Sequence, residues 1–452
     1  MMTAAASEAE AQRAFAAGGE AWRGGRIEAA AQAFARAAQL RPGWATAHAN
    51  LGAALRRLGK SEAAVASYRR ALALEPDQAA TLSNLGNALR DLGRLDEAAA
   101  ALRRAVELDP GSIGFLYNLA LLLRDQRRHH EAAGLLERVL ASDPANAEYQ
   151  WDLALSRLYL GDYRRGFAGY EARLGLARNP RRDVPGQRWT GAESVAGRTV
   201  LLTSEQGFGD ALQFARYVPL LAGLGAAVVL ECQPELADLF ASLPGVVALV
   251  SKGAPPPPYD LWLPMASLPH VMGTTFETIP AAVPYLTPPP RPDLSVPRPP
   301  GTVLSVGLVW AGKTTPRDRS WPLEDLLPLF TDARVAIYSL QLGPRAADLA
   351  RLGVDRLLID AAPALASFAD TAAVMARLDL IVTIDTATAH LAGALGRPVW
   401  VLLRHVSDWR WQDDPATSPW YPTMRLFRQP DPLDFKTSVA EAARALRTLL
   451  PP

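Results

Sequence analysis

The sequence predicts an α + α/β protein, in which an N-terminal α-solenoid precedes two Rossmann-like lobes. Residues 8–175 contain a helical repeat, because small residues, large apolar residues and prolines return at one fixed spacing. After residue 197, short apolar runs alternate with helical segments, which is typical of parallel sheets covered by helices on both faces. We expect a linker at 176–197, a first lobe at 198–300 and a second lobe at 301–452.

The repeat has a period of 34 residues. The in-phase positions are Pro42, Pro76, Pro110 and Pro144; Gly18, Gly52 and Gly86; Ala30, Ala64, Ala98 and Ala132; and Phe34, Tyr68, Leu102, Leu136 and Tyr170. Each period fits two antiparallel helices, in which small residues allow close approach and the proline ends the second helix. The pattern resembles the tetratricopeptide (TPR) repeat, with five copies, the fifth degenerate from Gly166 onward.

Three successive repeats carry an asparagine two residues before the small position: Asn50, Asn84 and Asn118. The resemblance to peptide-binding TPR domains implies that these side chains line a concave surface and grip an extended peptide. The alternative is that they face solvent on the first helix of each repeat. We therefore expect a protein acceptor as the partner of the repeats.

Composition argues against several other classes of protein. The 47 basic and 46 acidic residues leave a net charge of +1, whereas a nucleic-acid-binding surface needs a strong basic excess. Cys232 is the single cysteine, so no intrachain disulfide is expected, and its place after an apolar strand predicts a buried thiol. No apolar run approaches the roughly 20 residues that span a bilayer, and the N-terminus does not resemble a signal peptide. We expect a cytoplasmic protein.

The first lobe should contain the strands 199–202, 226–230 and 246–250. Between the first strand and a helix expected at 211–224 lies the turn Gly207-Phe208-Gly209-Asp210, at the edge of the sheet where such folds bind ligands. The turn lacks the third glycine of a dinucleotide fingerprint, and Glu205 and Asp210 would repel a pyrophosphate.

Asp210 is the candidate general base for a hydroxyl acceptor, because a carboxylate on this turn would face the space between the lobes. An ordinary helix N-cap is the alternative, and the spacing alone favours the cap. Gln206 lies on the same turn. It is a candidate contact for the hydroxyl acceptor or for the donor of the group that the acceptor would receive.

The second lobe contains the strand 380–384, the turn Asp385–Thr388 and a helix at 390–395. Unpaired backbone N–H groups and the positive end of the helix dipole favour bound phosphate at this turn, although a plain helix cap would use the same residues. The other expected strands are 306–310, 335–341 and 399–403. Lys313, after the strand 306–310, is a candidate phosphate contact, with a solvated lysine as the alternative. Gln341 ends the next strand, where a nucleobase could be read.

The loop after residue 403 is rich in aromatic residues, among them Trp409. These rings could stack on a base or sugar, or they could pin the loop by being buried. His405 is a second acid/base candidate. A final helix at 438–450 is expected to pack across both sheets.

The stretch I-D-T-A-T-A-H-L-A-G-A-L-G-R-P-V-W, residues 384–400, resembles the D-T-G-x-x-H-L-A-x-A-L-G-x-P-V signature of heptosyltransferase-like glycosyltransferases (family 9) of GT-B fold. The residues that would bind the phosphate of a nucleotide-sugar donor are then Asp385, Thr386, Ala387, Thr388 and His390. Ala387 stands where the family usually has glycine.

The resemblance extends to three other places. Gly209-Asp210 resembles the Gly-Asp turn whose aspartate is regarded as the catalytic base. Lys313 lies where these enzymes and TPR-fused O-GlcNAc transferases have a lysine on the leaving phosphate. Arg319 begins R-S-W-P-L, which is similar to the R-S-x-x-L of the family.

The combined prediction is a protein O-glycosyltransferase that moves a sugar to Ser or Thr of an acceptor held by the repeats, with inversion. Flagellin is a candidate acceptor, since similar bacterial fusions modify it with nonulosonic acids. No D-x-D motif and no His/Cys/carboxylate cluster occurs, so we expect neither metal nor cofactor, and the nucleotide-sugar is a substrate. The alternative is a TPR scaffold whose transferase half is inactive, which Ala387 favours.

Overall fold

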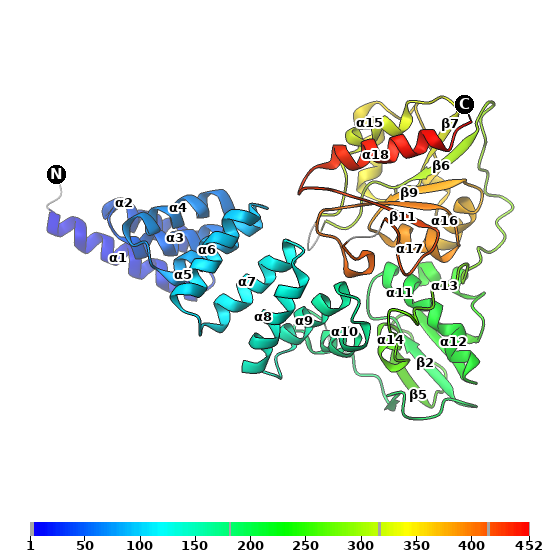
Figure 1. The fold of residues 1–452 in the computed structure, drawn as a ribbon, viewed down its shortest axis with the longest axis horizontal. Coiled ribbons are helices and arrows are strands. Elements are labelled where there is room, and N and C mark those ends of the chain that lie inside the picture. Colours follow the sequence, from blue (N-terminus) through cyan, green and yellow to red (C-terminus); the bar gives the residue numbers. More distant parts are fainter. Residues whose placement is uncertain (1–3, 180–181, 315–317, 414–415, 452) are drawn as a thin grey trace. The chain divides into compact units, whose positions relative to one another are not determined.

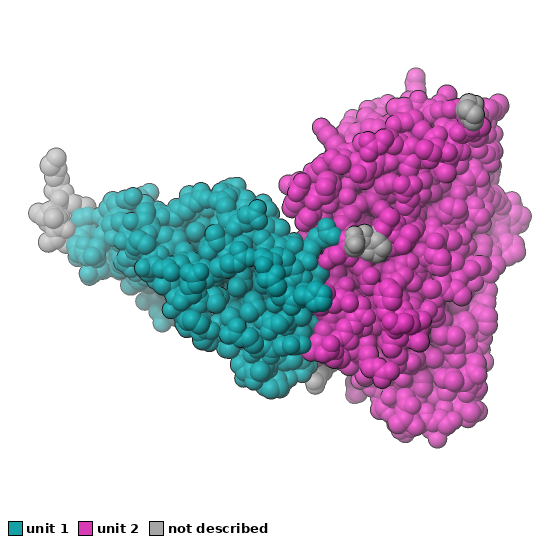
Figure 2. All heavy atoms as spheres, viewed as in Figure 1, with its two compact units in different colours: residues 1–156 teal, residues 157–452 magenta. Residues whose placement is uncertain are grey.

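The computed structural model describes residues 4–179, 182–314, 318–413 and 416–451 (Figure 1). The chain divides into two compact units, Met1–Ser156 and Arg157–Pro452, which Figure 2 colours separately. Across the described ranges, no helix combines the length and the apolar character needed to cross a membrane.

The first unit consists of paired helices, as predicted. They are α1 (Ala4–Arg23), α2 (Ile27–Leu40), α3 (Ala45–Arg57), α4 (Ser61–Leu74), α5 (Ala79–Asp91), α6 (Leu95–Leu108), α7 (Ile113–Asp125), α8 (His129–Ser142) and α9 (Ala147–Tyr159), within which the unit ends. The in-phase glycines and large residues are the two sides of one contact. A Cβ on Gly18 would lie 2.7 Å from the ring of Phe34, and one on Gly86 would lie 2.5 Å from Leu102. The large side chain of each second helix fills the space left by the glycine of the first.

Gly86→Ala is expected to destabilise the first unit by about 1–3 kcal/mol, because the added methyl group overlaps Leu102 in a closed contact. Gly134→Ala is the matched control, since a Cβ there meets nothing within 4 Å, and it should stabilise α8 by about 0.5–1 kcal/mol. Denaturant unfolding followed by helical circular dichroism measures both. Equal midpoints for the two variants would contradict the packing account.

After the last residues of α9, the second unit contains α10 (Tyr163–Tyr170) and the short helix η1 (Glu171–Gly175). Its first lobe is a parallel sheet in the order β1-β5-β2-β3-β4. The strands are β1 (Gln187–Arg188), β2 (Thr199–Thr203), β3 (Ala227–Cys232), β4 (Val246–Ser251) and β5 (Leu261–Pro264). The helices are α11 (Phe208–Phe214), η2 (Ala215–Tyr217), α12 (Val218–Gly223), α13 (Pro234–Phe240), η3 (Met265–Ser267) and α14 (Leu268–Val271).

The first lobe differs from the prediction in two places. Part of the expected linker 176–197 is an edge strand, because Gln187 and Arg188 pair with β5. The helix expected from Ala211 begins at Phe208, since Gly207 has an extended backbone and forms the N-cap. Cys232 is buried as predicted, and burial raises the pKa of its thiol to about 11.

The second lobe is a six-stranded parallel sheet in the order β11-β10-β9-β6-β7-β8. The strands are β6 (Leu304–Leu308), β7 (Val335–Ser339), β8 (Ile359–Asp360), β9 (Leu380–Ile384), β10 (Val399–Leu403) and β11 (Met424–Arg428). The helices are η4 (Leu323–Phe330), η5 (Pro344–Ala347), α15 (Asp348–Leu352), η6 (Ala362–Ala364), α16 (Phe368–Met375), α17 (Ala387–Ala394), η7 (Trp409–Trp411) and α18 (Phe435–Thr448).

The expectation that the final helix packs across both sheets is wrong. α18 packs against η4, β10 and β11, all in the second lobe. Its buried face, which includes Val439, Ala442 and Leu446, belongs to the same apolar core as Trp321. α18 thus completes the core of one lobe and leaves the junction of the lobes to other helices.

Both sheets have a topological switch point, where the chain turns from one side of the first strand to the other. In the first lobe it lies between β2 and β5, and in the second between β6 and β9. Loops diverge at the carboxyl ends of such strand pairs, and ligands of parallel α/β folds bind there. Figure 1 shows α11 and α13 of the first lobe beside α17 and α16 of the second, which they contact.

Candidate functional site

The predicted phosphate-binding turn lies at the switch point of the second lobe. Thr386 has an extended backbone and is the N-cap of α17, so the first N–H groups of that helix have no preceding helical carbonyl. Residues 385–388 are partly exposed, although the Asp385 side chain is only 13% exposed. β9 is buried along its whole length, which fixes the position of the turn that follows it.

The loop after β6 carries two basic candidates to this turn. A Cβ on Gly312 would lie 2.8 Å from Thr386 Cγ2, so the loop passes directly against the start of α17. Lys313, the next residue, is exposed. Arg319 Nη1 lies 3.2 Å from Asp385 Oδ2. Arg319 is therefore in contact with the turn 385–388, and Lys313 directly follows the glycine that passes against it; phosphate binding by these residues stays a prediction.

Asp385 is a carboxylate beside a proposed anion site, and its surroundings limit its charge. Burial raises the pKa of Asp385, Arg319 opposes that rise, and the nearby Asp408 adds to it. The Arg319 guanidinium thus compensates a carboxylate that would otherwise repel a phosphate at the start of α17.

The other lobe places Asp210 at the third position of α11. Asp210 Oδ2 accepts a hydrogen bond from the backbone N–H of Gly207 (3.2 Å). The alternative prediction of Asp210 as the helix N-cap is wrong, because Gly207 is the N-cap and Asp210 contacts it from the third helical position. Its Oδ1 accepts from Arg410 Nη2 (2.5 Å). The side chain remains 26% exposed, so a substrate hydroxyl can reach it.

The starts of α11 and α17 meet across the two lobes. A Cβ on Gly209 would lie 2.9 Å from the His390 ring and 3.6 Å from Ala387 Cα, so only glycine permits this approach. The proposed base and the proposed phosphate turn therefore share one junction between the lobes.

His390 forms the wall of this junction. It is 5% exposed, its Nδ1 hydrogen-bonds the Tyr421 hydroxyl (2.9 Å), and its ring stacks on Trp411. Burial, and then the guanidinium groups of Arg410 and Arg216, lower the pKa of His390 well below its usual value. The imidazole is therefore neutral and supplies no positive charge to a phosphate.

Two other predicted site residues, Gln341 and His405, make hydrogen bonds within the second lobe. The buried Gln341 accepts from the backbone N–H groups of Trp310 and Ala311 through Oε1 and donates to two carbonyls through Nε2, so its amide joins the ends of β6 and β7. This arrangement favours a structural role over base reading. His405 lies two residues after the end of β10, where its backbone N–H donates to Gln429 Oε1 (3.2 Å).

For Trp409 the second of the two predictions holds: the ring is buried and fixes the loop in place. It is 1% exposed and packs against Phe167 and Trp420, with ring centroids 5.6 and 5.9 Å away. Tyr163 accepts hydrogen bonds from Trp420 and Gln412 through its hydroxyl. α10, the second helix of the predicted fifth repeat, is therefore built into the second unit, and Trp409 is not open to a ligand.

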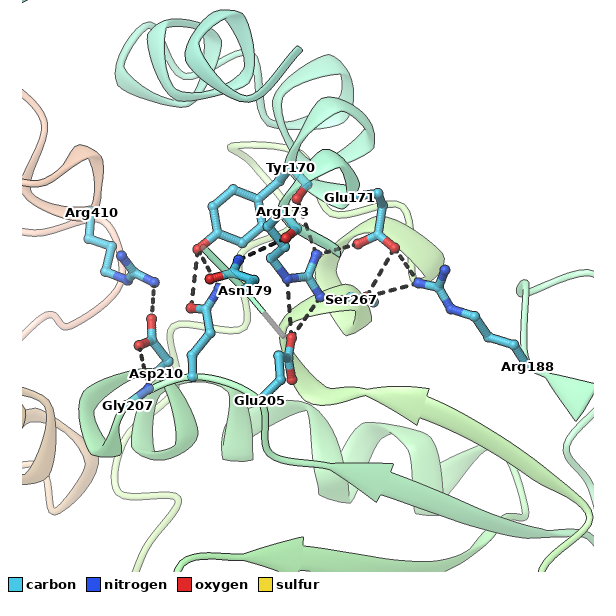
Figure 3. Close-up of polar contacts among 11 residues, drawn as sticks. Tyr170, Glu171, Arg173, Asn179, Arg188, Glu205, Gly207, Asp210, Ser267 and Arg410 are labelled. Atoms are coloured by element: carbon cyan, nitrogen blue, oxygen red, sulfur yellow. Dashed lines mark hydrogen bonds and ion pairs between the residues drawn. The ribbon is translucent and has the colours of Figure 1, made fainter. Parts of the chain in front are cut away.

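Arg173 is a buried residue of this region that the sequence did not single out. It is 1% exposed and lies 2.8 Å from Glu205, 2.7 Å from Glu171 and 2.7 Å from Ser267 Oγ (Figure 3). Burial disfavours its charge, but Glu205 and Glu171 raise the pKa of Arg173 above its ordinary value. Glu205 follows β2 and Ser267 follows β5, so Arg173 fills the switch point of the first lobe.

The predicted turn residue Gln206 is held by the same segment. Its Oε1 lies 3.2 Å from the Tyr170 hydroxyl at the end of α10. The turn that leads to Asp210 is thus fixed from both Tyr170 and Arg173 (Figure 3). No local signal reveals these contacts, because Arg173 and Ser267 are far apart in the sequence.

The asparagine row lies on α3, α5 and α7, the first helices of successive repeats: Asn50, Asn84 and Asn118. These helices contact one another and all three side chains are half-buried. Asn118 Nδ2 donates to Ser83 Oγ (3.0 Å), and Arg90 pairs with Asp125 (2.5 Å) between α5 and α7. The row exists as predicted, and peptide binding by it stays a prediction.

Comparison with known proteins adds family information. Two tetratricopeptide-repeat models match residues 15–79, 49–113 and 89–158, and a glycosyltransferase family 9 (heptosyltransferase) model matches residues 356–431. Protein FlbA of Caulobacter vibrioides (strain ATCC 19089 / CIP 103742 / CB 15) is 28% identical over 323 residues, with coverage of 64% of this chain. The match covers 53% of FlbA, so the chain aligns with about half of that relative.

Solved structures similar to part of the chain include PilF of Pseudomonas aeruginosa (22% identity, TM-score 0.34, 39% of this chain and 79% of that one). MamA of Desulfovibrio magneticus RS-1 is 19% identical (TM-score 0.35, 37% and 96%). YrrB, described as a TPR protein with an unusual peptide-binding site, is 18% identical (TM-score 0.32, 37% and 86%).

The family models and FlbA confirm the resemblance to a tetratricopeptide array joined to a heptosyltransferase-like glycosyltransferase. The family 9 match includes the start of α17 and Arg410 and lies wholly in the second lobe. The role of Asp210, in the first lobe, therefore depends on geometry and on the Gly-Asp resemblance.

Proposed function

We propose that this chain is a protein O-glycosyltransferase of the GT-B type that moves a sugar from a nucleotide-activated donor to Ser or Thr of a protein acceptor. The observation that carries the proposal is the meeting of α11 and α17 from opposite lobes at Gly209 and His390. This meeting places a partly exposed carboxylate, Asp210, near a helix start that suits an anionic leaving group.

The proposed reaction is a single displacement with inversion. Asp210 takes the proton of the acceptor hydroxyl while the oxygen forms a bond to the anomeric carbon. The bond from that carbon to the donor phosphate breaks, and its electron pair leaves with the nucleotide. The start of α17 and Lys313 stabilise the charge that develops on the phosphate, which needs no metal ion in this scheme.

The acceptor is proposed from the repeats. A protein-binding array has no use in transfer to a small carbohydrate, whereas it can hold a polypeptide while one hydroxyl enters the junction of the lobes. Flagellin is the candidate to test first, with Asn50, Asn84 and Asn118 as peptide contacts.

Intact-mass measurement tests the proposal directly. The protein is incubated with purified flagellin and CMP-, UDP-, ADP- and GDP-sugars in turn, with and without EDTA. We expect flagellin to gain the mass of one or more sugar residues with one class of donor, equally in EDTA. The absence of any gain with every donor would count against the function, and a gain abolished by EDTA would count against the metal-independent scheme.

An inactive scaffold is the second candidate, favoured by one observation. The family signature usually has glycine at the position of Ala387, so this chain has an extra methyl group at the start of α17. The start of this helix is already in contact with Gly209. A scaffold would bind the acceptor through its repeats and show no turnover of any donor.

A further inference from the structure

The carboxylate of Asp210 is held at both oxygens, from two different lobes. The backbone N–H of Gly207, in its own lobe, donates to Oδ2 (3.2 Å). Arg410 Nη2, in the second lobe, donates to Oδ1 (2.5 Å), as Figure 3 shows. Each oxygen keeps a second lone pair, so the carboxylate is oriented and can still accept a proton.

Arg410 is itself fixed on every side. It is 7% exposed, and its Nη1 donates to Asp408 Oδ1 (2.8 Å). Its Nε donates to Gln213 Oε1, one turn after Asp210 on α11. The guanidinium carbon lies 4.5 Å from the centre of the Trp409 ring, which α10 buries. A guanidinium group with this many contacts presents Nη2 in one direction only.

We propose that Arg410 is a positioning residue, which holds the Asp210 carboxylate in the orientation that receives the proton of the acceptor hydroxyl. This inference rests on the proposed transfer reaction. Asp210 lies on a helix of the first lobe, whereas the proposed donor-binding turn 385–388 lies in the second. A contact from Arg410, in the second lobe, therefore fixes the position of the base relative to the donor.

Arg410→Gln is expected to lower kcat about 10²-fold, because a base displaced by even about 1 Å loses its alignment with the attacking hydroxyl. The KM for the donor should stay near the wild-type value, since the phosphate turn 385–388 makes no use of Arg410. Arg410→Lys keeps the positive charge but loses the planar guanidinium group that donates to Asp210, Asp408 and Gln213 at once. Its kcat should therefore lie between those of the wild type and Arg410→Gln.

Arg291→Gln is the matched control. Arg291 also joins the lobes, through Asp238 on α13 (2.6 Å) and Asp370 on α16 (2.8 Å), but it does not touch Asp210. If Arg410 only held the lobes together, the two glutamine variants would have similar kinetics. We expect Arg291→Gln to keep the wild-type kcat.

A double variant completes the test. Adding Arg410→Gln to Asp210→Asn should cause no further loss of kcat, because a positioning residue has nothing left to position. Equal loss in the Arg410 and Arg291 variants, wild-type kcat in both Arg410 variants, or full additivity with Asp210→Asn would overturn the proposal. If the wild-type protein transfers no sugar, the proposed function fails first and this role fails with it.

Discussion

Asp210→Asn is expected to lower kcat for sugar transfer about 10²–10⁴-fold while donor affinity is kept. Asparagine has nearly the shape of aspartate, and its amide oxygen can still accept from the Gly207 N–H and hold the start of α11. It cannot take up the proton of the acceptor hydroxyl. Steady-state kinetics with the active donor, together with donor titration by calorimetry, separates these two effects.

Asp434→Asn is the matched control for this substitution. Asp434 caps α18, where its Oδ1 accepts from the Thr437 N–H (3.1 Å), and α18 packs on the second lobe away from α11. The control should transfer sugar at the wild-type rate. Wild-type turnover by Asp210→Asn would show that Asp210 is not the base. Acceptor binding without turnover in the wild type and both variants would favour the scaffold.

Arg173→Met should destabilise the second unit by about 3–5 kcal/mol, the typical cost of removing one partner of a buried ion pair. Methionine fills much of the volume, but Glu205 and Glu171 lose the cation that both contact. Ser267 Oγ loses the nearer of its two guanidinium donors and keeps the one from Arg188 (3.2 Å). Urea unfolding followed by tryptophan fluorescence gives the change in the free energy of unfolding.

Two further variants make this prediction specific. Arg334→Met removes an exposed pair with Asp332 and should leave the unfolding midpoint where it is. Arg173→Met combined with Glu205→Gln should recover part of the loss, since one uncompensated charge is removed with the cation. Glu171 keeps its ion pair with Arg188 in this variant, so Glu205 is the carboxylate left without a cation. An unchanged midpoint in Arg173→Met alone would contradict the expected cost of leaving Glu205 unpaired.

Local patterns in the sequence determined most of the elements, while some of their edges shifted by two or three residues, as in β6 (Leu304–Leu308, predicted 306–310) and α17 (Ala387–Ala394, predicted 390–395). The 34-residue period corresponds to the repeated contact of Gly18 with Phe34 and of Gly86 with Leu102. The strand predicted at 380–384 and the strand predicted at 399–403 are β9 and β10 without a shift. Such runs are predictable because a strand buried on both faces admits only apolar residues, whatever lies around it.

Candidate site residues could be named where helix starts follow strands, and this identified Asp210 and the turn 385–388. The same reasoning could not decide whether a side chain in a loop contacts a ligand or another part of the protein. Gln341 could have faced a ligand, but in the structure it bonds backbone groups. Trp409 could have stacked on a sugar, but α10 covers it.

By itself, the sequence thus determined the repeats, the two parallel lobes and the two helix starts, because each follows from periodicity or from a turn only a few residues long. Only the tertiary structure decided that Arg410 grips Asp210 and that Arg173 fills the switch point of the first lobe. Those pairs join segments that lie far apart in the chain. A buried charge finds its partner through the packing of whole elements, and no local spacing encodes that packing.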